Sequence, residues 1–439
     1  MKITKLEIEG YRSLRFQSWC PGDLNVLIGP NASGKSNLLR ALEMLSVAAR
    51  GGLGKYIQNE GGMEPIVWDG RSEKVRLQAK MTPLPPYTDP VKDALTYDLT
   101  LGRLGNSSVY RIDHELLGNF FKVETGEMPE PFKLLERDPH HAVVYSMATK
   151  RFETPLTTTT TTQPPCVSPG STNFEWMYDS NGLGSPSPEP PSTTLPPNEM
   201  SEDESLLSIA AGPFSTNRFV TGFQKELAAW KIHQGFQTHR EALIRASQVT
   251  RSDMQVSADG QNLISVLHSL YTSSREFKTE INTAMRAAFG DDFEELVFPP
   301  AADQRIQLRI RWRSLQREQS AADLSDGTLR FLFLLAVLAN PSPPPLIAID
   351  EPETGLHPSM LPIVAEYARD AANRSQVILT THSPEFLDAF GDEVPTTTVV
   401  ERREGQTNLR VVSGEELSYW LKQYTLGELY RSKELETLR

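Results

Sequence analysis

The sequence of 439 residues predicts an α/β fold built on a largely parallel sheet. Three observations support this prediction. A short apolar run at residues 23–29 leads into a glycine-rich turn, and residues 36–50 then have the apolar spacing of a helix. Over the last third of the chain, strand-like and helix-like segments alternate. Such alternation is typical of parallel sheets whose strands are connected by helices.

The same periodicities predict the other elements. Residues 2–14 alternate between apolar and polar side chains, as in a half-buried strand, whereas helical spacing dominates between residues 201 and 300. The predicted strands are residues 2–14, 23–29, 74–81, 97–103, 305–313, 345–350, 376–381 and 396–403. The predicted helices are residues 36–50, 223–234, 262–289, 328–339 and 358–372.

A low-complexity segment interrupts this pattern. Residues 154–197 contain six consecutive threonines and ten of the 32 prolines, a composition that buries too little apolar surface to offset the entropy of ordering. We expect a disordered loop here, either a solvated insertion without chemistry of its own or a regulatory loop whose Ser-Pro and Thr-Pro steps accept phosphate.

The expected organisation is one interrupted domain. Residues 1–150 and 301–439 would fold into a single head, residues 151–200 would be a Thr/Pro-rich insertion, and residues 201–300 would form a helical lid subdomain.

Charge and cysteine content narrow the class of protein. The chain has 44 Lys and Arg against 56 Asp and Glu, and the net charge of −12 argues against a surface that binds nucleic acid broadly. Two cysteines, Cys20 and Cys166, suit a reducing compartment. The first ten residues carry charges where a signal peptide needs an apolar run, and no segment has the ~20 apolar residues of a membrane helix. A cytoplasmic protein without membrane contact is therefore expected.

The most specific motif lies between the first parallel strand and its helix. It reads Gly29-Pro30-Asn31-Ala32-Ser33-Gly34-Lys35-Ser36 and matches the phosphate-binding pattern GxxxxGK[ST]. Its glycines let backbone amides turn inward around phosphates, and the helix N-terminus adds partial positive charge. Lys35 is expected to bridge the β- and γ-phosphates of ATP, and the Ser36 hydroxyl to bind Mg²⁺.

Far downstream, the apolar strand at residues 345–350 ends in two carboxylates. Asp350 is placed to hold Mg²⁺ through water, and Glu351 to polarise the attacking water as a general base. An acidic strand end is often structural, but together with the phosphate loop it indicates a catalytic site.

Two further segments fit the same nucleotide chemistry. Ser325, Asp326 and Gly327 open a strongly apolar helix, either as an ordinary helix cap or as groups presented to the γ-phosphate of a nucleotide on another subunit. His382 follows the predicted strand at 376–381, where it would contact the γ-phosphate if that strand ended beside Glu351.

The order and spacing of these motifs resemble the ABC-type ATPases, in the branch that contains SMC proteins and RecF, and the likeness is closer to the RecF-like and OLD-like ATPases. The segments that carry the resemblance are LEIEGYRSL, LNVLIGPNASGKSNLLRAL, LSDGTLR and IDEPETGLHP; GGMEPIVWDGR, DGQNLISVL and ELSYWLKQYTLGELYRS are also similar to a RecF-like subgroup. The resemblance covers nearly the whole chain apart from the Thr/Pro-rich insertion. It implies an ABC-type P-loop ATPase head with a mixed sheet and an inserted helical lid subdomain.

The resemblance also implies roles for individual residues. Lys35, Glu351 and His382 would be catalytic, with His382 as the switch residue, while Ser36 and Asp350 would hold the metal. Arg12 would approach phosphate as in relatives, or be an ordinary surface arginine. The nucleotide-binding residues would be Arg12, Gly29, Pro30, Asn31, Ala32, Ser33, Gly34, Lys35, Ser36 and Asn37, with Ser325, Asp326 and Gly327 serving the partner's nucleotide and Gly355 and His357 lining the dimer seam.

Two features depart from the family pattern or stay open. Asp326 stands where transporters have glycine, which argues against a transporter subunit. The glutamine that couples the metal to the lobe interface in relatives is either Gln58 or Gln78, and the sequence does not choose between them.

The resemblance implies an assembly of two chains, packed head to tail as a homodimer or within a higher oligomer. Each of two ATP molecules would lie between the phosphate loop of one chain and the LSDGT segment of the other. ATP would favour the closed dimer only through contacts that the open state lacks.

Two functions remain open. The first is an ATPase that couples hydrolysis to DNA repair or to antiviral defence, with local DNA contact at Arg305, Arg309, Arg311 and Arg313 unless nearby carboxylates balance these arginines. The second is a nucleotide-switched scaffold that gates a separate effector protein, such as a nuclease or toxin, without contacting DNA. The 57 residues after His382 are too few for a nuclease module, so any such effector is expected on another chain. A small-molecule kinase or a transporter would leave these motifs without a shared purpose.

Overall fold

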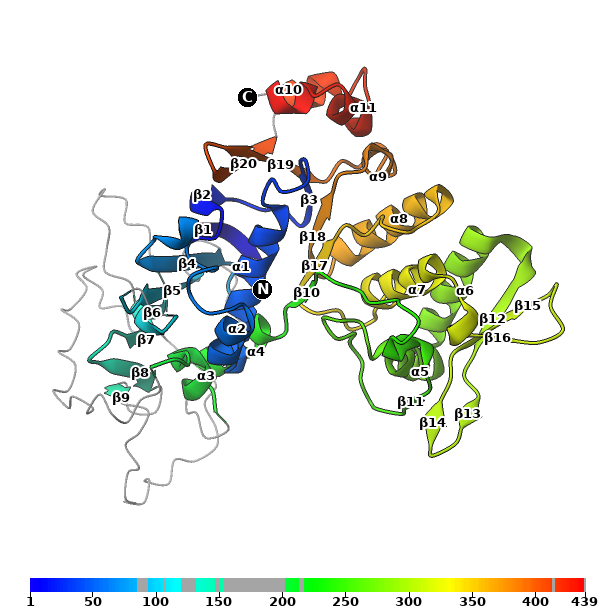
Figure 1. The fold of residues 1–439 in the computed structure, drawn as a ribbon, viewed down its shortest axis with the longest axis horizontal. Coiled ribbons are helices and arrows are strands. Elements are labelled where there is room, and N and C mark those ends of the chain that lie inside the picture. Colours follow the sequence, from blue (N-terminus) through cyan, green and yellow to red (C-terminus); the bar gives the residue numbers. More distant parts are fainter. Residues whose placement is uncertain are drawn as a thin grey trace, which may run out of the picture.

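The computed structural model describes residues 1–84, 94–105, 108–119, 132–146, 151–153, 202–212, 217–412 and 415–437. The Thr/Pro-rich segment at 154–197 lies outside the described residues. The described part consists of a six-stranded sheet, an eight-stranded sheet on one side of it and a helical subdomain on the other (Figure 1).

The six-stranded sheet is the parallel sheet that the sequence predicts. Its order is β10-β17-β18-β3-β19-β20, and only β20 runs antiparallel to its neighbour. Its central strands are short, almost fully buried runs, as expected for strands covered on both faces. The strands are β10 (Lys231–His233), β17 (Leu346–Asp350), β18 (Gln376–Thr381), β3 (Leu24–Ile28), β19 (Thr396–Arg403) and β20 (Gln406–Val412).

The eight-stranded sheet is antiparallel throughout, in the order β2-β1-β4-β5-β6-β7-β8-β9. Helix α1 (Lys35–Arg50) shares one apolar core with residues of both large sheets, so the sheets enclose it. The strands are β1 (Ile3–Tyr11), β2 (Leu14–Trp19), β4 (Lys74–Met81), β5 (Leu95–Arg103), β6 (Tyr110–Asn119), β7 (Phe132–Arg137), β8 (Ala142–Ser146) and β9 (Arg151–Glu153).

The lid subdomain lies on the other side of the six-stranded sheet (Figure 1, right) and shares a second apolar core with Val26 and Ile28 of β3. It contains the helices α5 (Leu263–Ser273), α6 (Arg275–Phe289) and α7 (Asp326–Leu338). Two small sheets complete it, formed by β11 (Gln248–Val249), β14 (Arg305–Ile306) and β13 (Pro300–Ala301), and by β12 (Phe293–Val297), β15 (Arg309–Trp312) and β16 (Gln319–Ser320).

The other helices cover the edges of these layers. Helix α8 (Leu361–Ala372) connects β17 to β18 and packs on α7. Helices α2 (Leu53–Asn59), α3 (Leu206–Ala210) and α4 (Arg218–Ala228) pack on α1. The C-terminal helices are α9 (Pro384–Asp388), α10 (Glu415–Trp420), α11 (Leu426–Arg431) and α12 (Glu434–Thr437). Among the described residues, no helix has the length and apolar character needed to span a membrane.

Residues 201–300, expected to form one helical lid subdomain, are divided between two parts of the structure. Helices α3 and α4 pack on α1 in the first lobe, whereas the lid subdomain continues beyond residue 300 to α7. The helix predicted at 223–234 is wrong in its second half, because α4 ends at Ala228 and residues 231–233 form β10 alongside β17. The helix predicted at 262–289 is two helices, because Ser274 is extended and its side chain caps α6 by accepting from the Phe277 amide.

The single strand predicted at 305–313 is also wrong, since β14 and β15 belong to different small sheets. Two of its arginines, Arg305 and Arg311, have local partners. Arg311 pairs with Glu295 at 2.5 Å and Glu318 at 2.7 Å, and Arg305 donates to the Ser247 carbonyl at 3.3 Å. Balance by local carboxylates, one of the two alternatives, therefore holds for Arg311.

His233 in β10 gives the fold a defined response to acid. Its ring is buried edge-on against Phe333, and its Nδ1 lies 3.2 Å from the Ala258 carbonyl. Burial lowers the pKa of His233 from 6.5 to about 4. Because the unfolded chain binds the proton more readily, this side chain contributes stability that is full above pH 6.5 and is lost as the pH falls toward 4.

We predict that His233→Asn, which retains a donor for the Ala258 carbonyl, removes about 2 kcal/mol of the stability difference between pH 7.5 and pH 5. Thermal unfolding at the two pH values measures this, and the acid-induced drop in midpoint should be smaller by roughly 2–4 °C in the variant than in the wild type. The exposed His239→Asn is the matched control. Equal drops in all three proteins would contradict the prediction.

Candidate nucleotide site

The phosphate loop connects β3 to α1 and ends on residues with unusual backbone conformations. Gly34 has φ 109° and Ala32 has φ 63°, so the loop turns its amides inward at a helix N-terminus. A Cβ on Gly34 would collide with Thr407 Oγ1, so that position requires glycine. Lys35 is 5% exposed, and its ammonium donates to the carbonyls of Gly29 at 2.7 Å and Pro30 at 3.2 Å. Burial lowers the pKa of Lys35, opposed by the neighbouring Glu351, Asp350 and Glu353.

The loop is supported from behind by residues that the sequence did not single out. Thr407, at the start of β20, donates from Oγ1 to the Ser33 carbonyl at 2.7 Å and lies 2.7 Å from Ser13 Oγ. The Asn37 side chain donates to the same Ser13 oxygen at 2.7 Å, so this predicted nucleotide-binding residue faces the support rather than the loop interior. Thr407 and Ser13 are too far apart in sequence for any local signal to have paired them.

The carboxylate of Asp350 lies beside the Ser36 hydroxyl, which donates to Oδ2 at 3.0 Å. The other oxygen of Asp350 accepts from Thr380 Oγ1 on β18. Asp350 and Thr380 are paired in register, so β17 and β18 bring these side chains together directly. Thr380 is a further residue that sequence reasoning missed.

This donor set fits Mg²⁺ bound to a nucleotide. Hydroxyl and carboxylate oxygens are hard ligands, and Mg²⁺ is usually held by one or two protein groups together with phosphates and waters. The described residues contain no cluster of three or more His, Cys, Asp or Glu side chains that would form an all-protein metal cage. Ser36 and Asp350 would therefore hold the ion only together with a bound nucleotide.

Glu351 occupies the turn directly after β17 in a left-handed conformation, with φ 47°. Such backbone strain in a residue other than glycine costs about 1–3 kcal/mol and often marks a functional position. The Glu351 amide donates to Thr380 Oγ1 at 3.0 Å, and its carboxylate Oε1 lies 3.1 Å from His382 Nδ1. The structure thus brings the predicted base and the predicted switch residue into contact.

Two charged residues beneath this turn complete the site. The side chain of Glu353 is only 8% exposed, and its Oε1 accepts from Thr381 Oγ1 at 2.5 Å and from the His382 amide at 3.3 Å. Burial raises the pKa of Glu353. Arg330, on α7, donates from Nη2 to the Glu351 carbonyl at 2.6 Å. The LSDGTLR and IDEPE segments contained both residues, but no motif assigned them a role.

The LSDGT segment begins α7. Ser325 is the helix N-cap, and its Oγ accepts from the Thr328 amide at 3.1 Å while remaining exposed. Arg245 pairs with Asp326 and donates to the Leu324 carbonyl at 2.7 Å, which holds the segment in place. Ser325 is therefore a helix cap, the first of the two alternatives, and its hydroxyl is still exposed to solvent.

The other predicted positions are engaged elsewhere. The Arg12 guanidinium pairs with Glu60 and is 14% exposed, so it is not an ordinary surface arginine. Gln78 donates to Asp98 Oδ2 at 2.8 Å within the eight-stranded sheet, while Gln58 is exposed on α2. His357 is exposed and caps the short helix at Pro358–Met360.

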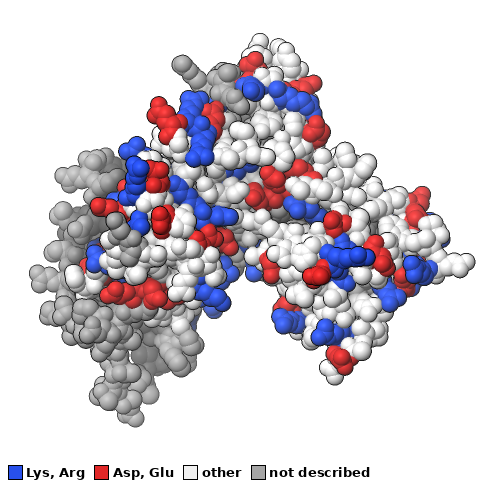
Figure 2. Space-filling view, in the orientation of Figure 1, with Lys and Arg blue, Asp and Glu red and all other residues white. Residues whose placement is uncertain are grey.

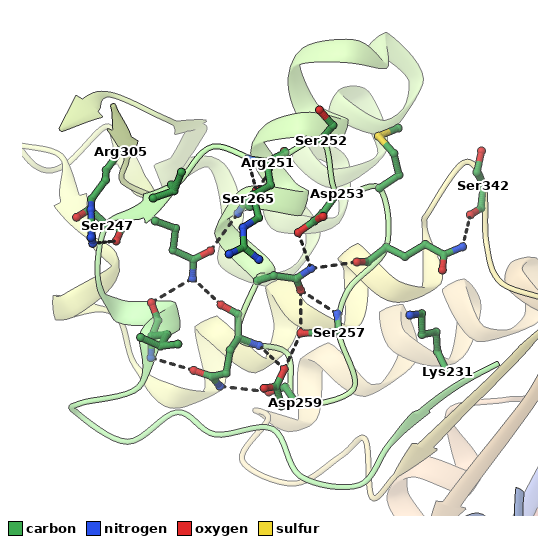
Figure 3. Close-up of a pocket in the computed structure, with 17 residues that line it drawn as sticks. Lys231, Ser247, Arg251, Ser252, Asp253, Ser257, Asp259, Ser265, Arg305 and Ser342 are labelled. Carbon is green, nitrogen blue, oxygen red and sulfur yellow. Dashed lines mark hydrogen bonds between the residues drawn. The ribbon is translucent and has the colours of Figure 1, made fainter. Parts of the chain in front are cut away.

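A separate cavity of about 890 Å³ lies in the lid subdomain (Figure 3). Its wall is a hydrogen-bonded network in which Asn262 Oδ1 accepts from the Ser257 amide and hydroxyl at 2.8 and 3.0 Å, and Gln248 donates to the Gln261 carbonyl at 2.6 Å. None of the predicted nucleotide-site residues lines this cavity, so it is distinct from the nucleotide site.

The phosphate loop follows β3, and the carboxylates of Asp350 and Glu351 follow β17, which is separated from β3 by β18. The LSDGT segment begins α7 on the lid subdomain. Together these features define the class as an ABC-type P-loop ATPase head. A family model described as "AAA domain, putative AbiEii toxin, Type IV TA system" matches residues 24–388. This match covers most of the chain, and the protein belongs to that family.

Comparisons with individual proteins agree with this class. The DNA replication and repair protein RecF of Moorella thermoacetica is 30% identical over 77 residues, which are 17% of this chain and 19% of RecF. The match therefore spans about a fifth of the length of that curated relative. The expectation of a RecF- and SMC-like ABC-type P-loop ATPase is confirmed.

Solved structures that resemble this chain include SMC heads. The SMC head bound to the C-winged helix domain of ScpA has a TM-score of 0.52 at 13% identity, over 95% of this chain and all of the other. The SMC head domain from Thermotoga maritima has a TM-score of 0.44 at 12% identity, over 94% of this chain and all of the other. The first of these likenesses confirms the α/β head fold, although its identity is too low to transfer a function.

We predict that Lys35→Ala weakens ATP binding on the order of 100-fold, because the variant loses a charged hydrogen-bond donor to the phosphates. Titration with a fluorescent ATP analogue measures the dissociation constant. Lys55→Ala, an exposed lysine on α2, is the control and should bind like the wild type. Undiminished ATP affinity in Lys35→Ala would contradict the assignment of the loop.

Proposed function

We propose that this protein binds ATP with Mg²⁺, hydrolyses it to ADP and phosphate, and uses the cycle to open and close a homodimer in a DNA-related process. One observation carries the enzymatic part of this proposal. Ser36 with Asp350, and Glu351 with His382, meet at the carboxyl edge of the parallel sheet, within hydrogen-bond distance of each other in each pair. Hydrolysis needs a phosphate-binding helix terminus, metal ligands and a base together, and these residues supply all three.

Each residue has a defined task in this proposal. The loop amides and Lys35 would bind the β- and γ-phosphates, and Ser36 and Asp350 would hold Mg²⁺, which neutralises phosphate charge when bound. Glu351 would take a proton from the attacking water. His382, on the neighbouring strand end, would contact the γ-phosphate and respond to its loss.

The exposed LSDGT segment supports a second copy as the partner. Ser325 and Asp326 are exposed at the start of α7, where a helix N-terminus favours an anion. A nucleotide on the partner chain would use this surface as the other half of its site. The dimer would then close with ATP and open after hydrolysis.

The DNA-related part of the proposal is supported by the partial likeness to a DNA replication and repair protein. Repair and defence against foreign DNA are the processes that we propose. The net charge of −12 requires that any DNA contact be local. On the face shown in Figure 2, basic side chains of the lid subdomain are interspersed with acidic ones rather than joined in a continuous stripe.

A second candidate is a nucleotide-switched scaffold that gates a toxin or nuclease on another chain without contacting DNA. The pairing of Arg311 with two carboxylates favours it, because these contacts compete with phosphate for the guanidinium. The toxin–antitoxin wording of the family description also supports it.

We predict that Glu351→Gln lowers ATP turnover by a factor of roughly 100 or more and accumulates an ATP-bound dimer, because the variant binds nucleotide but lacks the base. Size-exclusion chromatography with light scattering, with saturating ATP and Mg²⁺, measures the assembly. Glu366→Gln, an exposed glutamate on α8, is the control. A variant that stays monomeric with saturating ATP would overturn the proposed assembly.

The two candidate functions differ in their response to DNA. If the protein acts on DNA, we predict that double-stranded DNA raises its steady-state ATPase rate at least roughly 10-fold at low salt, and that the stimulation falls as salt is raised. An ATPase rate indifferent to DNA at every salt concentration, together with a co-purifying effector protein, would favour the scaffold instead.

A further inference from the structure

The cavity shown in Figure 3 lies where the lid subdomain meets the six-stranded sheet. Lys231 lines it from the edge strand β10, and Ser342 lines it from the loop between α7 and β17, while most of the other lining residues lie between 247 and 265. Its volume of about 890 Å³ is within the roughly 300–1,000 Å³ that is typical of small-molecule sites. The cavity therefore has the size of a ligand site, and both parts of the fold contribute to it.

The wall of the cavity is held by hydrogen bonds within the chain. Asn262 Oδ1 accepts from the Ser257 amide at 2.8 Å, and Asn262 Nδ2 donates to the Gln255 carbonyl at 3.2 Å. Asn340, in the loop after α7, donates to the Met254 carbonyl at 2.7 Å and so joins the wall to that loop. A ligand would meet a site that is already formed, which lowers the conformational cost of binding.

Two cations line this cavity without a counterion. Within the described part of the chain, neither the Lys231 ammonium nor the Arg251 guanidinium makes a hydrogen bond or an ion pair. Lys231 is partly buried, and burial lowers its pKa, as does the nearby charge of Arg50, whereas Asp253 opposes the shift. An anion beside such an ammonium would stabilise its charged form. The cavity therefore favours a negatively charged ligand.

Asp253 faces the same cavity and needs a donor instead (Figure 3). Its Oδ2 accepts from Asn262 Nδ2 at 3.3 Å, whereas its Oδ1 has no donor among the described residues. An ionised carboxylate only accepts hydrogen bonds, so a ligand that carried negative charge alone would be repelled here. A ligand that also carries hydroxyl groups would satisfy Asp253 and the two cations together.

The lining does not suit a nucleobase. Among the described residues that line the cavity none is aromatic, and the apolar ones are Leu243, Val249 and Met254. Bases are usually bound by stacking on aromatic side chains, which this surface lacks. Serine, glutamine and asparagine make up most of the lining instead, and their side chains hydrogen-bond to hydroxyl and phosphate groups.

We propose that this cavity binds a sugar phosphate, a small ligand that carries a phosphate ester and free hydroxyl groups. Lys231 and Arg251 would bind the phosphate oxygens, and Asp253 would accept a hydrogen bond from a hydroxyl group. The cavity is separate from the nucleotide site, so this binding does not require ATP or its hydrolysis. Ribose phosphate units of single-stranded RNA carry the same groups, and the test separates the two sources.

Isothermal titration calorimetry of the full chain with ribose 5-phosphate, in buffer without nucleotide, measures the binding. Lys231→Met and Arg251→Gln should each weaken it roughly 10-fold or more, because each variant loses a charged hydrogen-bond donor. The Arg251 side chain makes no contact that folding would lose, so this variant keeps the test valid if Lys231→Met unfolds. Arg240→Gln changes an exposed arginine outside the cavity, and it should bind like the wild type.

Asp253→Ala tests the hydroxyl contact. Loss of the carboxylate removes the same repulsion from ribose 5-phosphate and from inorganic phosphate, so the ratio of their dissociation constants isolates the hydroxyl groups. We expect the preference for ribose 5-phosphate to fall roughly 10-fold. An unchanged ratio would overturn the role of Asp253 and the choice of a sugar phosphate.

Lys35→Ala excludes binding at the phosphate loop, and it should bind ribose 5-phosphate as the wild type does. Loss of binding in Lys35→Ala would move the ligand to the nucleotide site and overturn the proposal. So would the absence of binding by the wild type at about 1 mM ribose 5-phosphate. If a single-stranded RNA oligonucleotide binds through Lys231 and Arg251 while ribose 5-phosphate does not bind, a free sugar phosphate is overturned as the ligand. None of these outcomes depends on whether the protein hydrolyses ATP.

Discussion

The parallel pairing of β3, β17 and β18 is the constraint on which the rest of the structure depends. In a parallel sheet all strands end at the same edge, and the loops after those ends form the binding site. The register pairs Asp350 with Thr380 and Thr381 with Ile28, so the three segments that follow these strands begin side by side. A slip of one residue would turn the Asp350 side chain to the opposite face and separate it from Ser36.

The parts of this edge that the sequence could predict are those whose signal is local. The phosphate loop, the apolar strand ending in Asp350 and the strand before His382 are each visible within about ten residues of sequence. The sequence could not predict what depends on distant pairing. Strand β10 has only three residues, too few to show an alternating apolar pattern, and it forms by pairing with the edge of β17. Thr407 and Arg330 meet the site only through the folded arrangement of β20 and α7.

Buried charge is concentrated where these elements meet. Lys35, Arg330 and Glu353 are all largely removed from water, and burial alone would favour the neutral form of each. Buried charges of this kind weaken a fold unless they are hydrogen-bonded and surrounded by opposite charge. Here Lys35 and Arg330 are both stabilised by the same three carboxylates, those of Asp350, Glu351 and Glu353. Removing any one of these charges therefore raises the free-energy cost of burying the others. This interdependence favours a functional origin over a purely structural one.

In the single chain, polar groups of the nucleotide site are hydrogen-bonded to one another, and this affects the energetics of the proposed dimer. The Lys35 ammonium is bound by loop carbonyls, and Ser36 is bound by Asp350. A bound nucleotide would replace these hydrogen bonds with its own, because the groups are already paired in the free chain. The free energy of binding to one chain is therefore smaller than the number of new contacts suggests. A ligand shifts a conformational equilibrium only by the contacts that differ between the two states. Lys35 would contact the phosphates, and Ser36 the metal, in the open and the closed state alike. The free energy that would close the proposed dimer therefore has to come from contacts that only the closed state has, among them those of the exposed start of α7 on the second chain.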